Sequence, residues 1–158
     1  MAASSAGLLL YRLNAHGDLD VLIVHPGGPF WARKDEGAWS VPKGEYAPED
    51  DQLETAYREF EEEIGLPVPP GPAHRLGEVR QPGGKRVVAW ALEADLDLAG
   101  AHSNTFELEW PKGSGNVREF PEVDRVEWVS LPVARTKLLK GQVAFLDLLL
   151  GHLQAEEP

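Results

Sequence analysis

The sequence contains no cysteine, and this absence excludes several kinds of chemistry. A disulfide framework, thiol catalysis and a zinc–thiolate site all need cysteine side chains. The chain also lacks an apolar run long enough to span a membrane. Its N-terminal stretch, MAASSAGLLLYRL, has no basic residue ahead of a short apolar run that ends before Arg12. We therefore interpret this stretch as a strand and not as a signal peptide, and we expect a cytoplasmic protein.

Basic residues are scarce, because 15 Lys and Arg stand against 26 Asp and Glu, for a formal net charge of −11. Such a chain repels the nucleic-acid backbone and anionic membrane surfaces, so we expect neither as a partner. A polyanionic substrate would need a local compensating charge, which acidic clusters supply by binding metal cations. At 158 residues, 42% of them hydrophobic, the chain should form a single domain, 1–158, with its own core.

Strands and helices are expected to follow one another without regular alternation, which favours an α+β fold over a doubly wound parallel sheet. The predicted strands cover residues 6–13, 20–25, 74–80, 86–96, 104–110 and 124–131. A Gly- and Pro-rich loop covers 26–39. Apolar side chains at three- and four-residue spacing predict a helix that begins near Pro48 and ends before Gly65. A second amphipathic helix is predicted over 141–153, with these residues inward: Val143, Leu146, Leu149, Leu150 and Leu153.

The segment GEYAPEDDQLETAYREFEEEIGL, residues 44–66, is strongly acidic. On a helix, Glu59, Glu62 and Glu63 stand at i, i+3 and i+4, so their carboxylates share one stripe beside the core face. Arg58 lies four residues after Glu54 and four before Glu62, and it can pair with either. Such a set of oxygen ligands suits Mg²⁺ or Mn²⁺. The alternative is a solvated helix face, which is the usual fate of a charge run.

The spacing within this segment resembles the Nudix box: Gly44, five residues, an acidic residue, seven residues, and then Arg-Glu-hydrophobic-any-Glu-Glu-any-Gly-hydrophobic over 58–66. One fixed position departs, because Asp50 stands where the box has glutamate. The resemblance implies a Nudix-type α/β/α sandwich with a mixed sheet. It also implies divalent-metal-dependent hydrolysis of a nucleoside diphosphate linked to another moiety.

The resemblance also implies roles for individual residues. Glu59, Glu62 and Glu63 match the metal-binding carboxylates, one of which is a candidate base, and Glu61 is expected to face solvent. Arg58 matches the arginine that orients those carboxylates through a salt bridge. Gly44 and Gly65 match positions where the loop and the helix turn tightly, and Asp50 is expected to act only as an N-terminal helix carboxylate. Outside the box, Glu119 and Glu122 precede a predicted strand. We expect Glu122, the closer one, to add a base or ligand; an ordinary loop carboxylate is the alternative.

The stretch WSVPKG, ahead of the box, resembles the asymmetrical diadenosine-polyphosphate hydrolases, in which Lys43 would meet a phosphate. Residues 120–134 and 141–149 resemble bacterial nucleoside-triphosphate pyrophosphohydrolases more closely. The other candidate phosphate contacts are Arg33, Lys34 and Arg86, together with Arg80 and Lys85. We therefore expect a pyrophosphohydrolase that acts on a small-molecule nucleoside polyphosphate with Mg²⁺ or Mn²⁺. The alternative is a catalytically silent Nudix-fold domain that binds nucleotides or proteins, but the three core glutamates of the box and its arginine are all present, which favours an enzyme.

Overall fold

A mixed sheet forms the centre of the protein, which is described by a computed structural model over residues 3–156. Its strand order is β4-β5-β1-β2-β8, with β3 paired to β1. The strands are β1 Ser4–Leu13, β2 Leu19–Pro26, β3 Lys43–Glu45, β4 Ala73–Arg80, β5 Arg86–Glu93 and β8 Val123–Ser130. β1 runs parallel to β5, whereas the pairs β1–β2, β1–β3, β2–β8 and β4–β5 are antiparallel. This topology confirms the expected α+β fold with a mixed sheet.

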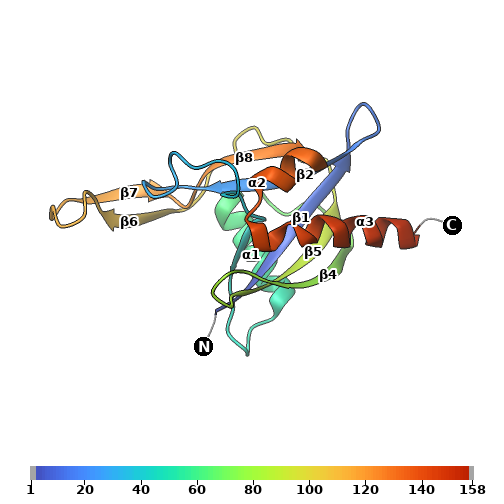
Figure 1. Ribbon diagram of the computed structural model, residues 1–158, viewed down its shortest axis with the longest axis horizontal. Helices are drawn as coiled ribbons and strands as arrows, with labels where there is room; N and C mark the ends of the chain where they lie inside the picture. The colour runs from blue at the N-terminus through green and yellow to red at the C-terminus, as the bar shows by residue number, and fades with distance from the viewer. Residues whose placement is uncertain (1–2, 157–158) are drawn as a thin grey trace.

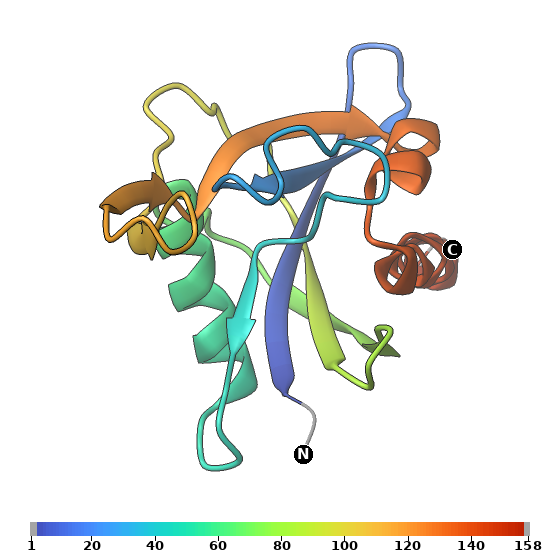
Figure 2. The same ribbon diagram turned by 60° about the vertical axis from the view of Figure 1, so that its left-hand side comes forward.

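Helices cover both faces of the sheet, which gives the expected three-layer sandwich (Figure 2). Helix α1, Gln52–Ile64, lies on one face; α2, Leu131–Lys137, the short 3₁₀ helix η1, Lys140–Gln142, and α3, Ala144–Glu156, lie on the other. Side chains of β1 alternate between the two sides, since Leu8 and Leu10 belong to the core under α1 while Leu9 and Tyr11 belong to the core under α3. A central strand buried in this way positions α1 firmly against the sheet.

Helix α1 begins later than predicted. Asp51 is its N-cap and accepts a hydrogen bond from the Glu54 N–H at 3.0 Å. Asp50 lies in the preceding turn, where its side chain accepts from the Ala47 N–H at 2.9 Å, so the prediction that it lies in the first helical turn is wrong. The predicted end is confirmed: Gly65 has φ 76° and donates its N–H to the Glu61 carbonyl at 2.8 Å.

Strands β3 and β7 and helix α2 were not predicted from the sequence. Strands β6, Thr105–Glu109, and β7, Val117–Pro121, form a separate hairpin that projects from the main body (Figure 1). β6 matches the predicted strand 104–110, but β7 lies between the predicted strands 104–110 and 124–131, where no strand was predicted. Strand β3 has only three residues, and α2 has seven, with a proline near its start; both are too short to show a clear period.

The C-terminal helix is close to the prediction. Leu146 and Leu149 are fully buried, and Val143 and Leu153 pack partly buried against the same core. Leu150 is only half-buried, and Phe145 is the additional buried residue. The helix begins at Ala144 because residues 140–142 form η1. Within residues 3–156, no helix is both long and apolar enough to cross a membrane.

Candidate active site

The acidic stripe on α1 lies next to its core face. Phe60 and Ile64 are fully buried under the helix, and Glu63, one residue before Ile64, is only 9% exposed. Glu59 and Glu62 are half-buried, whereas Glu61 is exposed. The Glu61 carboxylate accepts from the Val68 N–H at 3.2 Å, so it helps to hold the loop after the helix. The stripe therefore differs from a uniformly solvated helix face.

Strand β3 approaches this stripe closely. The Lys43 N–H donates to Glu63 Oε1 at 3.4 Å. A Cβ atom on Gly44 would overlap the Glu59 carboxyl group, so glycine is what allows the strand and the helix to meet. Gly44 pairs with Ala6 in the β1–β3 ladder and is not among the positive-φ glycines. The expected tight turn at Gly44 is therefore wrong, and close approach is its physical role.

Arg58 contacts Glu59 and not the partners that helical spacing suggested. Its Nη2 lies 3.8 Å from Glu59 Oε1, and its side chain is 55% exposed. Ion pairs with Glu54 and Glu62 are not seen in the described structure. An exposed pair at this distance contributes little to stability. It does place a positive charge beside the stripe.

Glu122 lies at the same site, although it is about sixty residues away from α1 in the sequence. It is the single residue between β7 and β8, and its N–H donates to the Asn104 carbonyl at 2.8 Å. A pocket of about 150 Å³ is lined by Val24, Pro26, Ser40, Lys43, Glu63, Glu122 and Val123. Three predicted site residues, Lys43, Glu63 and Glu122, thus line one pocket although they are far apart in the chain. The sequence analysis did not predict Ser40 as a residue of this site, although it lies within the WSVPKG stretch that pointed to Lys43.

The charges around this pocket act on one another. Burial, together with the Glu59 charge, raises the pKa of Glu63 to about 8. Burial and the Glu62 charge raise the pKa values of Glu59 and Glu122. Burial lowers the pKa of Lys43, although the nearby carboxylates oppose this. Glu59, Glu63 and Glu122 are therefore carboxylates whose ionised forms a bound cation would stabilise.

The donor set fits a hard divalent cation, because every one of these ligands is a carboxylate oxygen. Within residues 3–156, however, no group of three or more His, Asp or Glu side chains is already arranged to hold a metal ion. The carboxylates would have to converge further to ligate one. Glu59, Glu62 and Glu63 are best placed to do so, since they share one helix stripe next to the pocket.

The other predicted phosphate contacts do not line this pocket. Arg86 pairs with Glu78 at 3.6 Å, and the Lys34 ammonium lies 5.1 Å from the centre of the Trp31 ring. Arg33 is exposed in the same loop as Lys34. Lys85, by contrast, is close enough to lower the pKa of Lys43. Lys43 is therefore the basic residue that the structure brings into the pocket itself.

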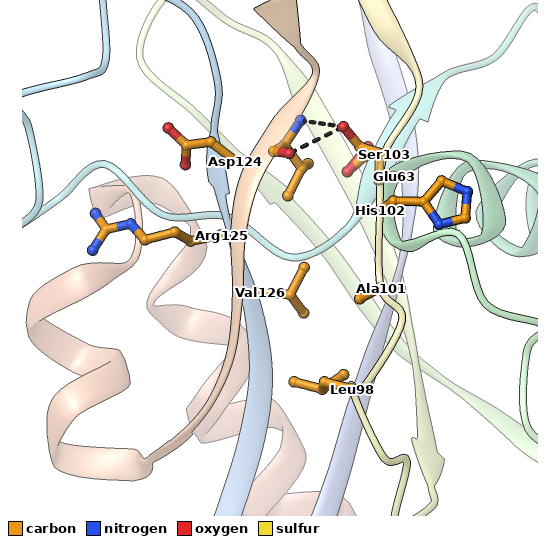
Figure 3. Close-up of a pocket in the computed structure, with 9 residues that line it drawn as sticks. Glu63, Leu98, Ala101, His102, Ser103, Asp124, Arg125 and Val126 are labelled. Atoms are coloured by element: carbon orange, nitrogen blue, oxygen red, sulfur yellow. Dashed lines mark hydrogen bonds between the residues drawn. The ribbon is translucent and has the colours of Figure 1, made fainter.

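A second cavity, of about 210 Å³, lies beside the first and shares Glu63 and Val123 with it. It lies between β8 and the segment 98–103 (Figure 3). Ser103 bridges these two walls through hydrogen bonds to the backbone of Val123, drawn as dashed lines in Figure 3. Nothing in the sequence pattern indicated that Ser103 would lie at this site.

Comparisons with known proteins match nearly the whole chain. A family model described as the NUDIX domain matches residues 3–149. A search of curated proteins finds no match. Among solved structures, an Ap4A hydrolase from C. elegans in a binary complex is 22% identical, with a TM-score of 0.63, over 98% of this chain and 99% of that one.

Two further structures are similar to this chain. The NUDIX domain of Shewanella oneidensis NrtR, complexed with ADP ribose, is 16% identical with a TM-score of 0.67, over 97% of this chain and 89% of that one. A mutT/nudix family protein from Listeria innocua is 17% identical with a TM-score of 0.64, over 98% and 95%. At these identities the likeness shows a shared fold.

Proposed function

This chain belongs to the Nudix family, and from that premise we propose that it hydrolyses a diphosphate linkage in a nucleoside polyphosphate with Mg²⁺ or Mn²⁺. One observation carries the proposal: Lys43, Glu63 and Glu122 line one pocket, with Glu59 and Glu62 close enough to raise the pKa values of its carboxylates. Such a constellation can bind a cation, contact a phosphate and accept a proton within one site.

Glu59, Glu62 and Glu63 would hold the cation. When bound, a divalent ion screens the negative charge of the phosphates and makes water a better nucleophile. The Arg58 guanidinium, 3.8 Å from Glu59, would restrain that carboxylate. Gly44 supports the same arrangement, since its missing side chain leaves space for Glu59 against β3.

Glu122 is the proposed general base. It lines the same pocket as Glu63 of α1, and burial together with the Glu62 charge raises its pKa, which makes it a better proton acceptor. In the reaction, a water oxygen forms a bond to phosphorus and its proton passes to the Glu122 carboxylate. The bridging oxygen then leaves with the electron pair of the broken P–O bond. The Lys43 ammonium would stabilise the charge on the phosphate chain.

We propose a dinucleoside polyphosphate or a nucleoside triphosphate as the substrate class. A chain of net charge −11 attracts a polyanion only through local groups, so more phosphate oxygens mean more contacts to the cation and to Lys43. The resemblance of WSVPKG to diadenosine-polyphosphate hydrolases, and the fold shared with an Ap4A hydrolase, support the longer substrates.

The test is a phosphate-release screen of nucleoside triphosphates, dinucleoside polyphosphates and nucleotide sugars, with magnesium and with chelator. We expect turnover that vanishes with chelator, returns with Mg²⁺ or Mn²⁺, and has the highest kcat/KM for dinucleoside tetra- or pentaphosphates. Undiminished turnover in metal-free buffer would contradict the role of the carboxylates. Nucleotide binding without turnover of any substrate would identify the silent, binding-only alternative.

A further inference from the structure

Residues 102–104 connect the end of helix α1 to the chain around Glu122. The His102 N–H donates to the Ile64 carbonyl at 2.8 Å, and the Asn104 N–H donates to the Glu62 carbonyl at 2.8 Å. Carbonyls in the last turn of a helix have no amide partner within that helix. Segment 102–104 supplies these partners, and it therefore has a fixed position relative to the carboxylates of α1.

The same segment is bonded on its other side to the beginning of β8. The Asn104 carbonyl accepts from the Glu122 N–H at 2.8 Å. The Ser103 hydroxyl accepts from the Val123 N–H at 3.1 Å, and its own proton faces the Val123 carbonyl at 3.0 Å (Figure 3). The Asn104 carbonyl, 2.8 Å from the same hydroxyl oxygen, is the other acceptor within reach of that proton. The backbone at Glu122 and Val123 is thus tied to α1 through three consecutive residues.

The position of Glu122 depends on these hydrogen bonds, because Glu122 lies between two separate sheets. It joins β7, which belongs to the projecting hairpin, to β8, which belongs to the main sheet. A two-stranded hairpin alone is marginally stable and does not by itself fix the residue at its base. The Gly27 N–H donates to the Glu122 carbonyl at 2.9 Å from the other side. Backbone hydrogen bonds on both sides of Glu122 therefore fix its place in the pocket that it shares with Glu63 of α1.

We infer that Ser103 is a positioning residue that holds Glu122 against the carboxylates of α1. This inference rests on the proposed function, in which Glu122 accepts a proton. Val123 is 8% exposed, so its amide and carbonyl would lose a buried partner if the hydroxyl were removed. The adjacent cavity of about 210 Å³ is large enough for water to replace that partner. Ser103→Ala should therefore weaken the hydrogen-bonded connection between residues 102–104 and the beginning of β8 without unfolding the protein.

The kinetic test compares Ser103→Ala and Ser103→Thr, each alone and with Glu122→Gln. We expect Ser103→Ala to lower kcat by about 10-fold with KM within about twofold, since misplacing a reacting group affects turnover more than binding. Ser103→Thr should restore kcat. In the Glu122→Gln background, Ser103→Ala should cause no further loss. The matched control is Ser130→Ala, which removes a serine hydroxyl that accepts from the Val133 N–H at the start of α2, remote from the site.

A second readout does not depend on turnover. We expect faster hydrogen exchange at the Glu122 and Val123 amides in Ser103→Ala, with no change at the Val24 amide, which donates to the Ser40 carbonyl. If the parent protein has no turnover but these two amides respond, the positioning bonds stand and the proposed function fails. If Glu122→Gln lowers kcat while Ser103→Ala matches the parent, or loses activity equally in both backgrounds, the inference is overturned.

Discussion

Replacing Glu63 by Gln should raise the stability of the metal-free protein at neutral and alkaline pH, although it removes a proposed metal ligand. Burial and the Glu59 charge raise the pKa of Glu63 from 4.5 to about 8. Between these two pH values the folded protein holds a proton that the unfolded chain has released. Protons therefore stabilise the fold, and the free energy of unfolding falls as pH rises from about 4.5 through about 8.

The size of this effect follows from the pKa difference. At about 1.4 kcal/mol per pKa unit, the interval from 4.5 to about 8 corresponds to an upper bound of about 5 kcal/mol. Gln still accepts from the Lys43 N–H, but the Lys43 ammonium loses its nearest opposite charge, which reduces the gain. We expect Glu63→Gln to be more stable than the parent by about 2 kcal/mol at pH 8, or about 4–8 °C in Tm.

The assay is urea unfolding with chelator at pH 5, 7 and 8, with Glu61→Gln as the matched control because Glu61 is exposed on the same helix. The difference between Glu63→Gln and the parent should be small at pH 5 and grow with pH, whereas the control should follow the parent. Added Mg²⁺ should then stabilise the parent more than the variant. Parallel stability curves for the parent and Glu63→Gln would refute the reasoning.

Two other predictions concern turnover. Glu62→Gln and Glu63→Gln should each lose at least about 100-fold in kcat, as expected when a metal ligand or acid–base group is removed. Glu61→Gln should retain activity. Equal losses at all three positions would favour the alternative of a solvated helix face. Lys43→Ala should raise KM for dinucleoside tetra- or pentaphosphates more than for nucleotide sugars, because Lys43 lines the pocket and a longer phosphate chain can reach it. A competition assay with both substrate types measures this difference. An equal loss for both substrate types would contradict the polyphosphate assignment.

Local spacing was sufficient to predict the helix and its carboxylate stripe. The helical period fixes which residues share a face, so the positions of Glu59, Glu62 and Glu63 beside the core residues follow from the sequence. The partner of Arg58 did not follow. Spacing allowed Glu54 or Glu62, but the Arg58 guanidinium lies 3.8 Å from Glu59, whose carboxyl group also packs against Gly44 of β3. Helical spacing limits which residues can meet, but it does not decide which of the possible side-chain pairs forms.

Long-range placement was harder to predict, because short elements show no period. The three residues of β3 bring Lys43 to Glu63, and the hairpin β6–β7 leads the chain to Glu122. Resemblance to a known family suggested a base or ligand outside the box, for which we chose Glu122, but the backbone contacts around Glu122 come from residues 102–104. Those contacts are mainly backbone hydrogen bonds, which amino-acid identity specifies only weakly.

The local charge at the pocket would explain how so acidic a protein could act on the proposed polyanionic substrate. With every group ionised, Glu59, Glu62, Glu63 and Glu122 outweigh Lys43 and Arg58 by two negative charges, which one divalent cation would balance. Burial and, after it, the neighbouring glutamates raise the pKa values of Glu59, Glu63 and Glu122, so a bound cation would favour their ionised forms. A polyphosphate adds further negative charge, so it must enter together with cations of its own. The acidic composition then disfavours bare polyanions such as nucleic acids while still admitting a small substrate that arrives as a metal complex.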